Sequence, residues 1–342
     1  MGVGDGQDAV GLLLARSGGV MQAKKPTLPP FRSLLKSTEV EDPVNICVHR
    51  PLAYAFVWSI FRTPITPNGV TLMAILAGLA SGAFFLSGTP TAMIAAGALL
   101  WTAAILDGAD GILARAKGQA SQFGRALDGA ADVIVAVATV FPAFAHLYFK
   151  DQNTTHLWLM GPAIGLTAVH LWLYDFYKEN YLRRTRLDRG GEGEDPEQVA
   201  RLVESAKAKG AITHFAVKHV LLPYVQTQQK IIRLLDPLAV VGRNDVARNE
   251  KTAAIYRRHN QGPMRLWAIV SLAPHSYLMA ICAMCDRLDV YLYLRLFGMN
   301  AIFLVAALWQ RRATRATVDD LRDIGALPPE DSAPSETLAT GV

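Results

Sequence analysis

Four aspartates stand at two helical spacings between residues 107 and 132. Asp107 and Asp110 are three residues apart and Asp128 and Asp132 are four apart, so each pair shares one face of a helix. A polar turn at residues 116–122 would join the two helices as a hairpin and bring the carboxylates together. Carboxylates in apolar surroundings repel one another, and divalent cations that prefer hard oxygen ligands relieve this repulsion. The spacing therefore predicts a site for Mg²⁺ or Mn²⁺.

Small residues and one arginine accompany these carboxylates. Arg115 stays protonated at any working pH and suits a phosphate. Gly111 and Ala114 keep the first helix thin beside the aspartates, and Gly124 does the same for the second helix. This pattern predicts a cavity above the metals that is wide enough for a flat or bulky ligand. The alternative, a solvated helix end and loop, is disfavoured because unpaired charge between apolar helices is costly.

The stretch from Asp107 to Asp132 resembles the signature of the CDP-alcohol phosphotransferase (CDP-alcohol phosphatidyltransferase) family, in its bacterial-type integral membrane form. The signature reads D-x2-D-G-x2-A-R-x8-G-x3-D-x3-D, and it is filled here by Asp107, Asp110, Gly111, Ala114, Arg115, Gly124, Asp128 and Asp132. The helical pattern of the family would cover residues 64–311, with the two ends and one long insert outside it.

The resemblance implies a role for each of these residues. Asp107, Asp110 and Asp128 would be ligands of two metal ions, and Asp132 would be the catalytic general base and a further metal ligand. The pocket for the nucleotide and the phosphates would be formed by Asn68, Asp110, Gly111, Ala114, Arg115 and Gly124. For Asn68, which stands at the start of the first membrane span, a simple helix cap explains the residue almost as well.

The resemblance also implies a reaction. The acceptor hydroxyl would attack the β-phosphorus of a CDP-linked donor, CMP would leave, and a phosphodiester would form. The favoured version transfers a phosphatidyl group from a CDP-diacylglycerol-type lipid to a small alcohol, in phospholipid biosynthesis. The alternative transfers the head group of a soluble CDP-alcohol to a lipid or polyol acceptor. Both versions leave the identity of the acceptor open.

Arginines near the end of the fourth span and in the fifth are candidates for binding a phosphorylated acceptor. Inositol phosphate or glycerol phosphate would need a basic pocket beside the metals. The candidates are Arg183, Arg184 and Arg265, together with Arg186, Arg257 and Arg258. Arginines at a cytoplasmic helix end are more often signals of membrane topology.

Two other classes of protein compete with an enzyme. A bundle of six spans with buried acids could be a cation-coupled transporter, and a scaffold could keep the fold without the activity. No inverted repeat is evident in the sequence, and the acids are concentrated in one hairpin with the motif intact. An enzyme is therefore favoured, and metal-dependent release of CMP would separate it from both alternatives.

The composition is that of a polytopic membrane protein. Of the 342 residues 51% are hydrophobic, the mean hydropathy is +0.21 and the net charge is +5. Such a chain is too apolar for an ordinary soluble domain. The basic balance is typical of Lys and Arg near cytoplasmic helix ends and of contact with anionic membrane lipid. No basic stripe interleaved with aromatic residues points to nucleic acid.

The predicted fold class is all-α, with six transmembrane helices preceded by an interfacial amphipathic helix. The expected spans are residues 69–87, 91–114, 123–147, 157–177, 264–284 and 290–309. The expected division is a disordered cytoplasmic tail (1–42), an interfacial helix (43–63), four spans with the motif (64–186), a cytoplasmic insert (187–263), two spans (264–311) and a second disordered tail (312–342). An extra span is the alternative for residues 43–62.

The insert combines a Gly- and acid-rich loop at 188–195, an exposed helix at 196–209 and an amphipathic surface helix at 215–235. Its role is open. Lys and Arg follow the second, fourth and sixth spans, so both termini and the site should face the cytoplasm. The resemblance to the bacterial-type family further implies a protein of the bacterial inner membrane. Small residues within the spans allow a homodimer, which the resemblance also suggests.

Overall fold

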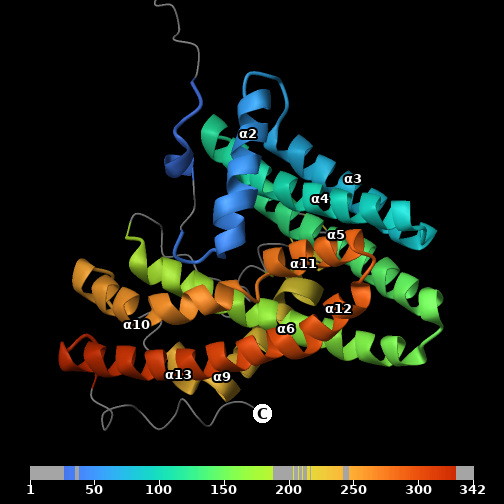
Figure 1. The fold of residues 1–342 in the computed structure, drawn as a ribbon. Coiled ribbons are helices and arrows are strands. Elements are labelled where there is room, and N and C mark those ends of the chain that lie inside the picture. The colour runs from blue at the N-terminus through green and yellow to red at the C-terminus, as the bar shows by residue number, and fades with distance from the viewer. Residues whose placement is uncertain are drawn as a thin grey trace, which may run out of the picture.

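The computed structural model describes residues 27–34, 38–187, 217–241 and 246–328, with a few single positions between 203 and 215. Within these residues all regular elements are helices (Figure 1). The predicted loop at 188–195 and almost all of the predicted helix at 196–209 lie outside the described residues, as do residues 1–26 and 329–342.

Among the residues that the structure describes, six helical segments are long and apolar enough to cross a membrane. This finding confirms the predicted all-α polytopic fold. The segments are Pro67–Ser87 (α3), Pro90–Lys117 (α4), Leu127–Asp151 within Gln122–Asp151 (α5), Thr154–Thr185 (α6), Glu250–Met284 (α10, Glu250–Ala268, with α11, Leu272–Met284) and Leu288–Asp323 (α12, Leu288–Tyr293; η5, Leu294–Gly298; α13, Met299–Asp323).

The last two segments differ in length from the sequence-based prediction. We expected the fifth span to begin near Met264 and the sixth to end near Trp309, but α10 begins at Glu250 and α13 ends at Asp323. The additional turns are amphipathic and pack against each other and against the end of α6 (Figure 1). A search for continuous apolar runs misses such turns because only one face of each helix is buried.

The segment before the first span forms a helix, as predicted for residues 43–63. A π-helical turn at Asn45–His49 precedes α2 (Arg50–Ile60), and Pro51 stands in the first turn of α2, where its missing N–H costs nothing. Trp58 is 71% exposed on this helix. Its position in the membrane interface stays a prediction.

The residues just before this helix are fixed to the bundle, although they belong to the tail expected to be disordered up to residue 42. The Tyr174 hydroxyl donates to the carbonyl of Val40 at 2.8 Å, and the Tyr181 hydroxyl donates to Glu39 at 2.7 Å. Phe31–Leu34 form a 3₁₀ turn (η1) beside α2 and α4. The chain therefore leads into α2 along a defined path over α6.

Helix α3 packs against both α4 and α5, whereas α4 and α5 make few direct contacts with each other. Gly78 and Gly82 allow the close approach of α3 to α5, because a Cβ at Gly78 would lie 2.7 Å from Val135 and one at Gly82 would collide with the Ala138 carbonyl. Small residues thus permit close packing of helices inside the bundle. As a result, α3 forms a wall behind the two helices that carry the motif.

The described part of the insert that precedes residue 242 is helical and rests on α6. It consists of η3 (Val217–Leu221), α9 (Leu222–Leu235) and η4 (Pro237–Val240). Val225 and Ile232 are buried, and Gln228 Nε2 donates to the Trp172 carbonyl at 2.7 Å. An amphipathic helix was predicted here, and its contact with a membrane surface stays a prediction.

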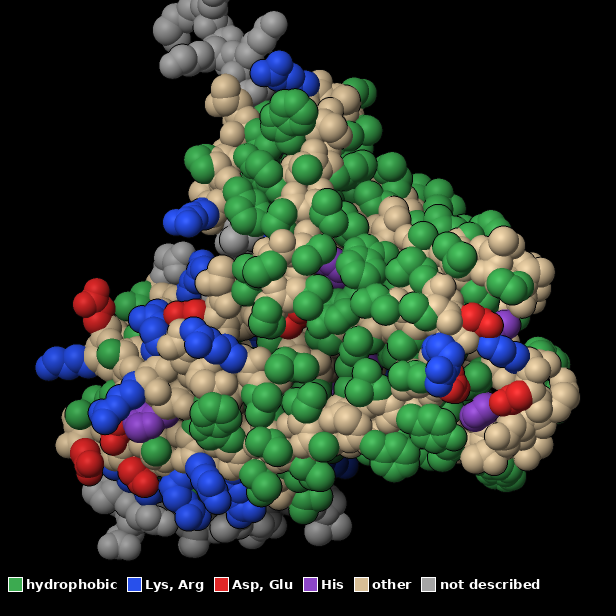
Figure 2. Space-filling view, in the orientation of Figure 1, with side chains coloured by type: hydrophobic (Ala, Val, Ile, Leu, Met, Phe, Trp, Pro, Cys, Tyr) green, Lys and Arg blue, Asp and Glu red, His purple; other side chains and the backbone are tan. Residues whose placement is uncertain are grey.

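Charged side chains gather at two ends of the molecule. On the face drawn in Figure 2, Lys and Arg cluster where α10 begins and α13 ends, and a smaller charged group lies at the opposite end, near the turn between α5 and α6. Hydrophobic side chains cover much of the area between them. This distribution suits a bundle that crosses a bilayer between the two charged ends.

Candidate functional site

The four motif aspartates lie on the facing helices α4 and α5. Asp107 interacts electrostatically with Asp110, Asp128 and Asp132, and Asp132 interacts with Asp110 and Asp128. Asp110 is buried, while the other three carboxylates are half-buried. The structure therefore places the four residues within electrostatic range of one another, with one pair contributed by each helix.

The turn between these helices is built by two capping residues. Helix α4 ends at Lys117, and Gly118 adopts the left-handed conformation (φ 63°) that glycine accepts without strain. The Ala114 carbonyl accepts from the N–H of Gln119 at 2.8 Å. Ser121 caps α5 by accepting from the N–H of Gly124 at 2.9 Å. The predicted polar turn at residues 116–122 is thereby confirmed.

Thr71 of α3 orients one of the carboxylates. Its hydroxyl lies 2.5 Å from Asp110 Oδ2 and 3.2 Å from the carbonyl of Pro67. Thr71 is buried, so this contact is shielded from water. Sequence reasoning missed Thr71, although a signal was present: it stands one helical turn after Asn68, which was singled out at the same end of α3.

The chemistry of this group of side chains fits a hard divalent cation. Four interacting carboxylates supply oxygen ligands and a concentrated negative charge, which Mg²⁺ and Mn²⁺ match. Within the described residues, no three Asp, Glu, His or Cys side chains are arranged as a group that could hold a metal ion. The carboxylates thus match the predicted ions in ligand type and in charge. In this structure they are not close enough together to coordinate one ion.

Two pairs of the residues expected to bind the nucleotide and phosphates lie close together, Arg115 with Gly111 and Asn68 with Gly124. Arg115 Nε donates to the Leu34 carbonyl at 2.7 Å, and the guanidinium lies 3.4 Å from where a Cβ on Gly111 would be. A Cβ on Gly124 would lie 3.5 Å from Asn68 Oδ1. The helix cap before α3 is the Thr66 hydroxyl, which accepts from Gly69 at 3.2 Å. Asn68 is therefore not that cap, and its side chain faces Gly124.

Arg50 of α2 reaches the motif from outside it. Its guanidinium is held by Glu41 at 2.9 and 3.0 Å and donates to the Gly108 carbonyl at 3.4 Å, next to Asp107. Arg50 and Asp107 also attract each other electrostatically. The sequence showed Arg50 only as the basic edge of an apolar helix, because nothing in its spacing links residue 50 to residue 107.

Helix α6 places two further charged groups near Asp132. Asp175 and Lys178 both interact electrostatically with the Asp132 carboxylate. In the sequence they were only charges close to the end of the fourth span. Their position beside the predicted general base follows from the packing of α6 in the bundle, which residue spacing alone does not encode.

The arginines proposed for an acceptor lie in different surroundings. Arg183 and Arg184 are buried near the end of α6, where Arg184 donates to the Val246 carbonyl at 3.1 Å and Arg183 lies 3.4 Å from Asn180 Oδ1. Arg265 is an exposed residue of α10. Arg184 therefore holds Val246 to the bundle, while the Arg183 guanidinium contacts a residue of its own helix.

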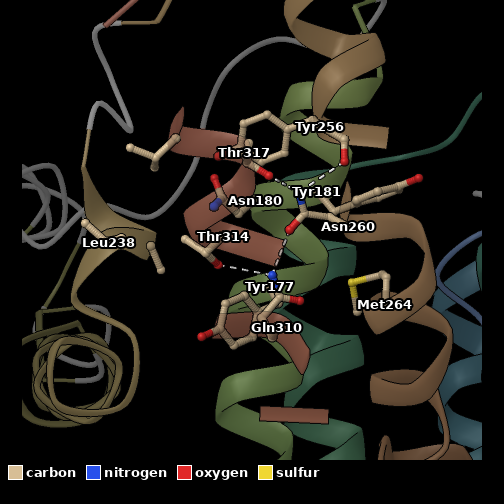
Figure 3. A pocket seen from close by; sticks show the side chains of 12 residues that line it. Tyr177, Asn180, Tyr181, Leu238, Tyr256, Asn260, Met264, Gln310, Thr314 and Thr317 are labelled. Carbon is tan, nitrogen blue, oxygen red and sulfur yellow. Dashed lines mark hydrogen bonds between the residues drawn. The ribbon is translucent and has the colours of Figure 1, made fainter. Parts of the chain in front are cut away.

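A separate polar cavity lies between α6, α10 and α13. Figure 3 shows Asn260 and Gln310 joined across it, with Gln310 Nε2 donating to Asn260 Oδ1 at 2.7 Å and Asn260 Nδ2 donating to Thr317 at 2.9 Å. Asp236 closes the network, because the Thr314 hydroxyl donates to its Oδ2 at 2.6 Å. Neutral amides and hydroxyls that satisfy one another are typical of a structural network.

Comparisons with known proteins place these helices in a wider context. A family model described as CDP-alcohol phosphatidyltransferase matches residues 64–240, just over half of the chain. The CDP-diacylglycerol–serine O-phosphatidyltransferase of Mycobacterium leprae (strain TN) is 44% identical over 111 residues. That match covers 32% of this chain and 32% of the relative, so the chain spans about a third of the relative's length. Both findings agree with the resemblance carried by the motif.

Proposed function

Because the chain belongs to the CDP-alcohol phosphatidyltransferase family, we propose that it transfers a phosphatidyl group from a CDP-linked lipid to an acceptor alcohol and releases CMP. The observation that carries this proposal is the mutual electrostatic interaction of the four motif aspartates across α4 and α5. A donor of the CDP-diacylglycerol type is supported by the name of the similar Mycobacterium leprae protein.

The carboxylates divide between two roles in this proposal. Asp107, Asp110 and Asp128 would hold Mg²⁺ or Mn²⁺, as two ions, with Asp132 as a further ligand. Such ions, when bound, neutralise pyrophosphate and lower the pKa of a coordinated hydroxyl. Thr71 fixes the orientation of Asp110 from behind, as outer partners of metal ligands generally do.

Asp132 acts as the general base. It accepts the proton of the acceptor hydroxyl while the oxygen forms a bond to the β-phosphorus of the donor. The bond between that phosphorus and the bridging oxygen breaks, and CMP leaves with the electron pair. Arg115 contributes a permanent positive charge for the phosphates, and Asn68, Gly111, Ala114 and Gly124 form the nucleotide side of the pocket.

We propose serine as the acceptor alcohol, since the relative with 44% identity is named as a serine O-phosphatidyltransferase. Arg183, Arg184 and Arg265 stay as proposed contacts for a phosphorylated acceptor. The burial of both α6 arginines, the contact of Arg184 with Val246 and that of Arg183 with Asn180 favour a structural role for them in this state. Head-group transfer from a soluble CDP-alcohol remains the second candidate.

In this proposal the site faces the cytoplasm of a bacterial inner membrane, and the protein forms a homodimer among membrane lipids. The gathering of Lys and Arg where α10 begins and α13 ends supports this orientation (Figure 2). Lys117, at the motif end of α4, donates to the carbonyls of Thr63 and Ile65 at 3.0 and 2.8 Å, so the motif lies near that helix end.

The test is release of CMP by the purified protein in detergent with Mg²⁺ or Mn²⁺. CDP-diacylglycerol and soluble CDP-alcohols are offered as donors, each with serine, inositol phosphate, glycerol phosphate and a lipid alcohol. We expect release with CDP-diacylglycerol and serine, and its loss with a chelator or with Asp132→Asn. Release only with a soluble CDP-alcohol would favour the second candidate. Cation uptake into vesicles without CMP release would instead support a transporter.

A further inference from the structure

Asp175 and Lys178 form an ion pair on the side of α6 that faces Asp132. Lys178 Nζ lies 2.6 Å from Asp175 Oδ1, and it also lies 4.8 Å from the centre of the Tyr174 ring. An ammonium over an aromatic face is held by the electrons of the ring. Both members of the pair interact electrostatically with the Asp132 carboxylate. The general base thus has one positive and one negative neighbour on α6.

This pair remains open to a solute. The Asp175 side chain is 48% exposed and that of Lys178 is 31% exposed. Each charged side chain therefore keeps surface that a small solute can contact. A bound molecule with both charges could replace each member of the pair by its own opposite group at little cost.

A second pair in the same protein shows what such a contact looks like away from the site. Lys150 Nζ also lies 2.6 Å from an aspartate, Asp286, and the two side chains are 43% and 40% exposed. Lys150 is 18 residues after Asp132 on α5, which places it about 27 Å along the helix. The two pairs match in chemistry, distance and exposure, and they differ in whether Asp132 is near.

The signs of these charges discriminate between acceptor classes. A phosphorylated alcohol carries only negative charge and would be repelled by Asp175, and an uncharged polyol would use neither group as an ion. An amino acid with a hydroxyl carries an ammonium, a carboxylate and the attacking oxygen on neighbouring carbons. Its ammonium, carboxylate and hydroxyl match Asp175, Lys178 and Asp132, respectively.

We propose that Asp175 binds the ammonium and Lys178 binds the carboxylate of a zwitterionic hydroxy-amino-acid acceptor, which directs its hydroxyl to Asp132. This inference rests on the proposed phosphatidyl transfer and adds the residues that select the acceptor. Asp175 and Lys178 are specificity-determining residues in this scheme, and the motif aspartates perform the chemistry.

The experiment measures CMP release with CDP-diacylglycerol and three acceptors: serine, ethanolamine, which lacks the carboxylate, and 3-hydroxypropionate, which lacks the ammonium. The wild-type protein should prefer serine over both. Asp175→Asn and Lys178→Gln should each raise the KM for serine about 10- to 100-fold, the value of a lost hydrogen bond to a charged group. The KM for CDP-diacylglycerol should not change. Asp175→Asn should reduce the preference over 3-hydroxypropionate, and Lys178→Gln the preference over ethanolamine.

Two further variants separate recognition from structure. Lys150→Gln removes the matched remote pair and should leave all kinetic constants unchanged. The double exchange Asp175→Lys with Lys178→Asp keeps the net charge and should still lose serine selectivity. Unchanged serine KM and unchanged acceptor preference in folded Asp175→Asn and Lys178→Gln would overturn the inference while leaving the transferase intact. Absence of CMP release from the wild-type protein with every acceptor would instead refute the proposed function.

Discussion

Asp110 and Asp236 are both buried carboxylates that accept a hydrogen bond from a threonine. The charges of their neighbours differ, because other acids surround Asp110 while hydroxyls and a cation surround Asp236. Asp110 is 6% exposed and lies 2.5 Å from the Thr71 hydroxyl, and Asp236 is 2% exposed and lies 2.6 Å from the Thr314 hydroxyl. Around Asp110 stand Asp107 and Asp132. Around Asp236 stand the Tyr177 hydroxyl, at 3.3 Å, and the positive charge of Arg311.

The comparison separates a functional from a structural buried acid. Burial and a threonine partner are common to both, so neither of them marks a site. The Asp236 carboxyl is surrounded by two hydrogen-bond donors and one cation, whereas Asp110 lies among other carboxylates, whose mutual repulsion an added cation would relieve. A local excess of charge of one sign is therefore the feature that indicates function here.

The largest expected effect comes from removing one carboxylate of the motif. Asp132→Asn should lower kcat about 10²- to 10⁴-fold, the usual contribution of a general base. The unfolding temperature should stay equal or rise, because one of four mutually repelling carboxylates is gone. CMP release and thermal unfolding in detergent measure the two effects. A large loss of stability would mean that the four acids support the fold, as Asp236 does.

The threonine partners offer a second test. Thr71→Val keeps the volume of the side chain and removes its contact with Asp110. We expect a loss of about 10- to 100-fold in activity or in apparent metal affinity, as for other outer partners of metal ligands. The metal dependence of CMP release is the measurement.

A matched control exists on α5. Thr139 is equally buried, and its hydroxyl donates to the Val135 carbonyl of its own helix at 2.7 Å. Thr139→Val should leave activity unchanged. Equal effects of the two substitutions would show that Thr71 acts by packing and not through Asp110.

Helical spacing was enough to find the acids at both ends of the motif. The fixed intervals from Asp107 to Asp132 predicted the hairpin, its polar turn and the grouping of four carboxylates, because these features depend on residues close in sequence. Length and apolarity predicted the six spans for the same reason.

Contacts between distant segments were outside the reach of such reasoning. Thr71, Arg50 and Lys178 reach the motif from α3, α2 and α6, and their approach is decided by how whole helices pack. Asp236 was not singled out at all, since a lone acid before a proline gives no signal of burial. The added turns of α10 and α13 were missed because only one face of each is apolar, and the two helices bury these faces against each other.

Removing the Asp236 carboxylate should have a smaller effect than removing that of Asp132. It should lower stability and leave turnover unchanged. Asp236→Ala deprives the hydroxyls of Thr314 and Tyr177 of their acceptor, and unsatisfied buried groups of this kind cost about 1–3 kcal/mol each. We expect a lower unfolding temperature and unchanged turnover per folded molecule. Lys150→Gln, which breaks an exposed pair, should change stability by about 0–1 kcal/mol. A loss of turnover in folded Asp236→Ala would connect the two regions functionally.

The smallest expected effect is a dependence of stability on pH that belongs to Asp236 alone. Burial raises the pKa of this carboxyl above its usual range, and the hydrogen bonds from Thr314 and Tyr177 and the charge of Arg311 oppose that rise only in part. A raised pKa in the folded state means that the folded protein holds the proton more tightly. Its contribution to stability is therefore present below the ordinary pKa of about 3.9 and is lost as the pH rises through the folded-state pKa.

Asp236→Asn keeps an oxygen that accepts from Thr314 and removes the titration. The unfolding temperature of this variant relative to the wild-type protein should thus increase as the pH is raised from the acid side, and it should level off once the wild-type carboxyl is ionised. Thermal unfolding of both proteins across that range is the measurement. A difference that decreases with rising pH would show that the ionised carboxylate is the form favoured by its neighbours. Asp236 would then resemble a paired surface acid more closely than a buried neutral one, and the contrast with Asp110 would rest on the like charges alone.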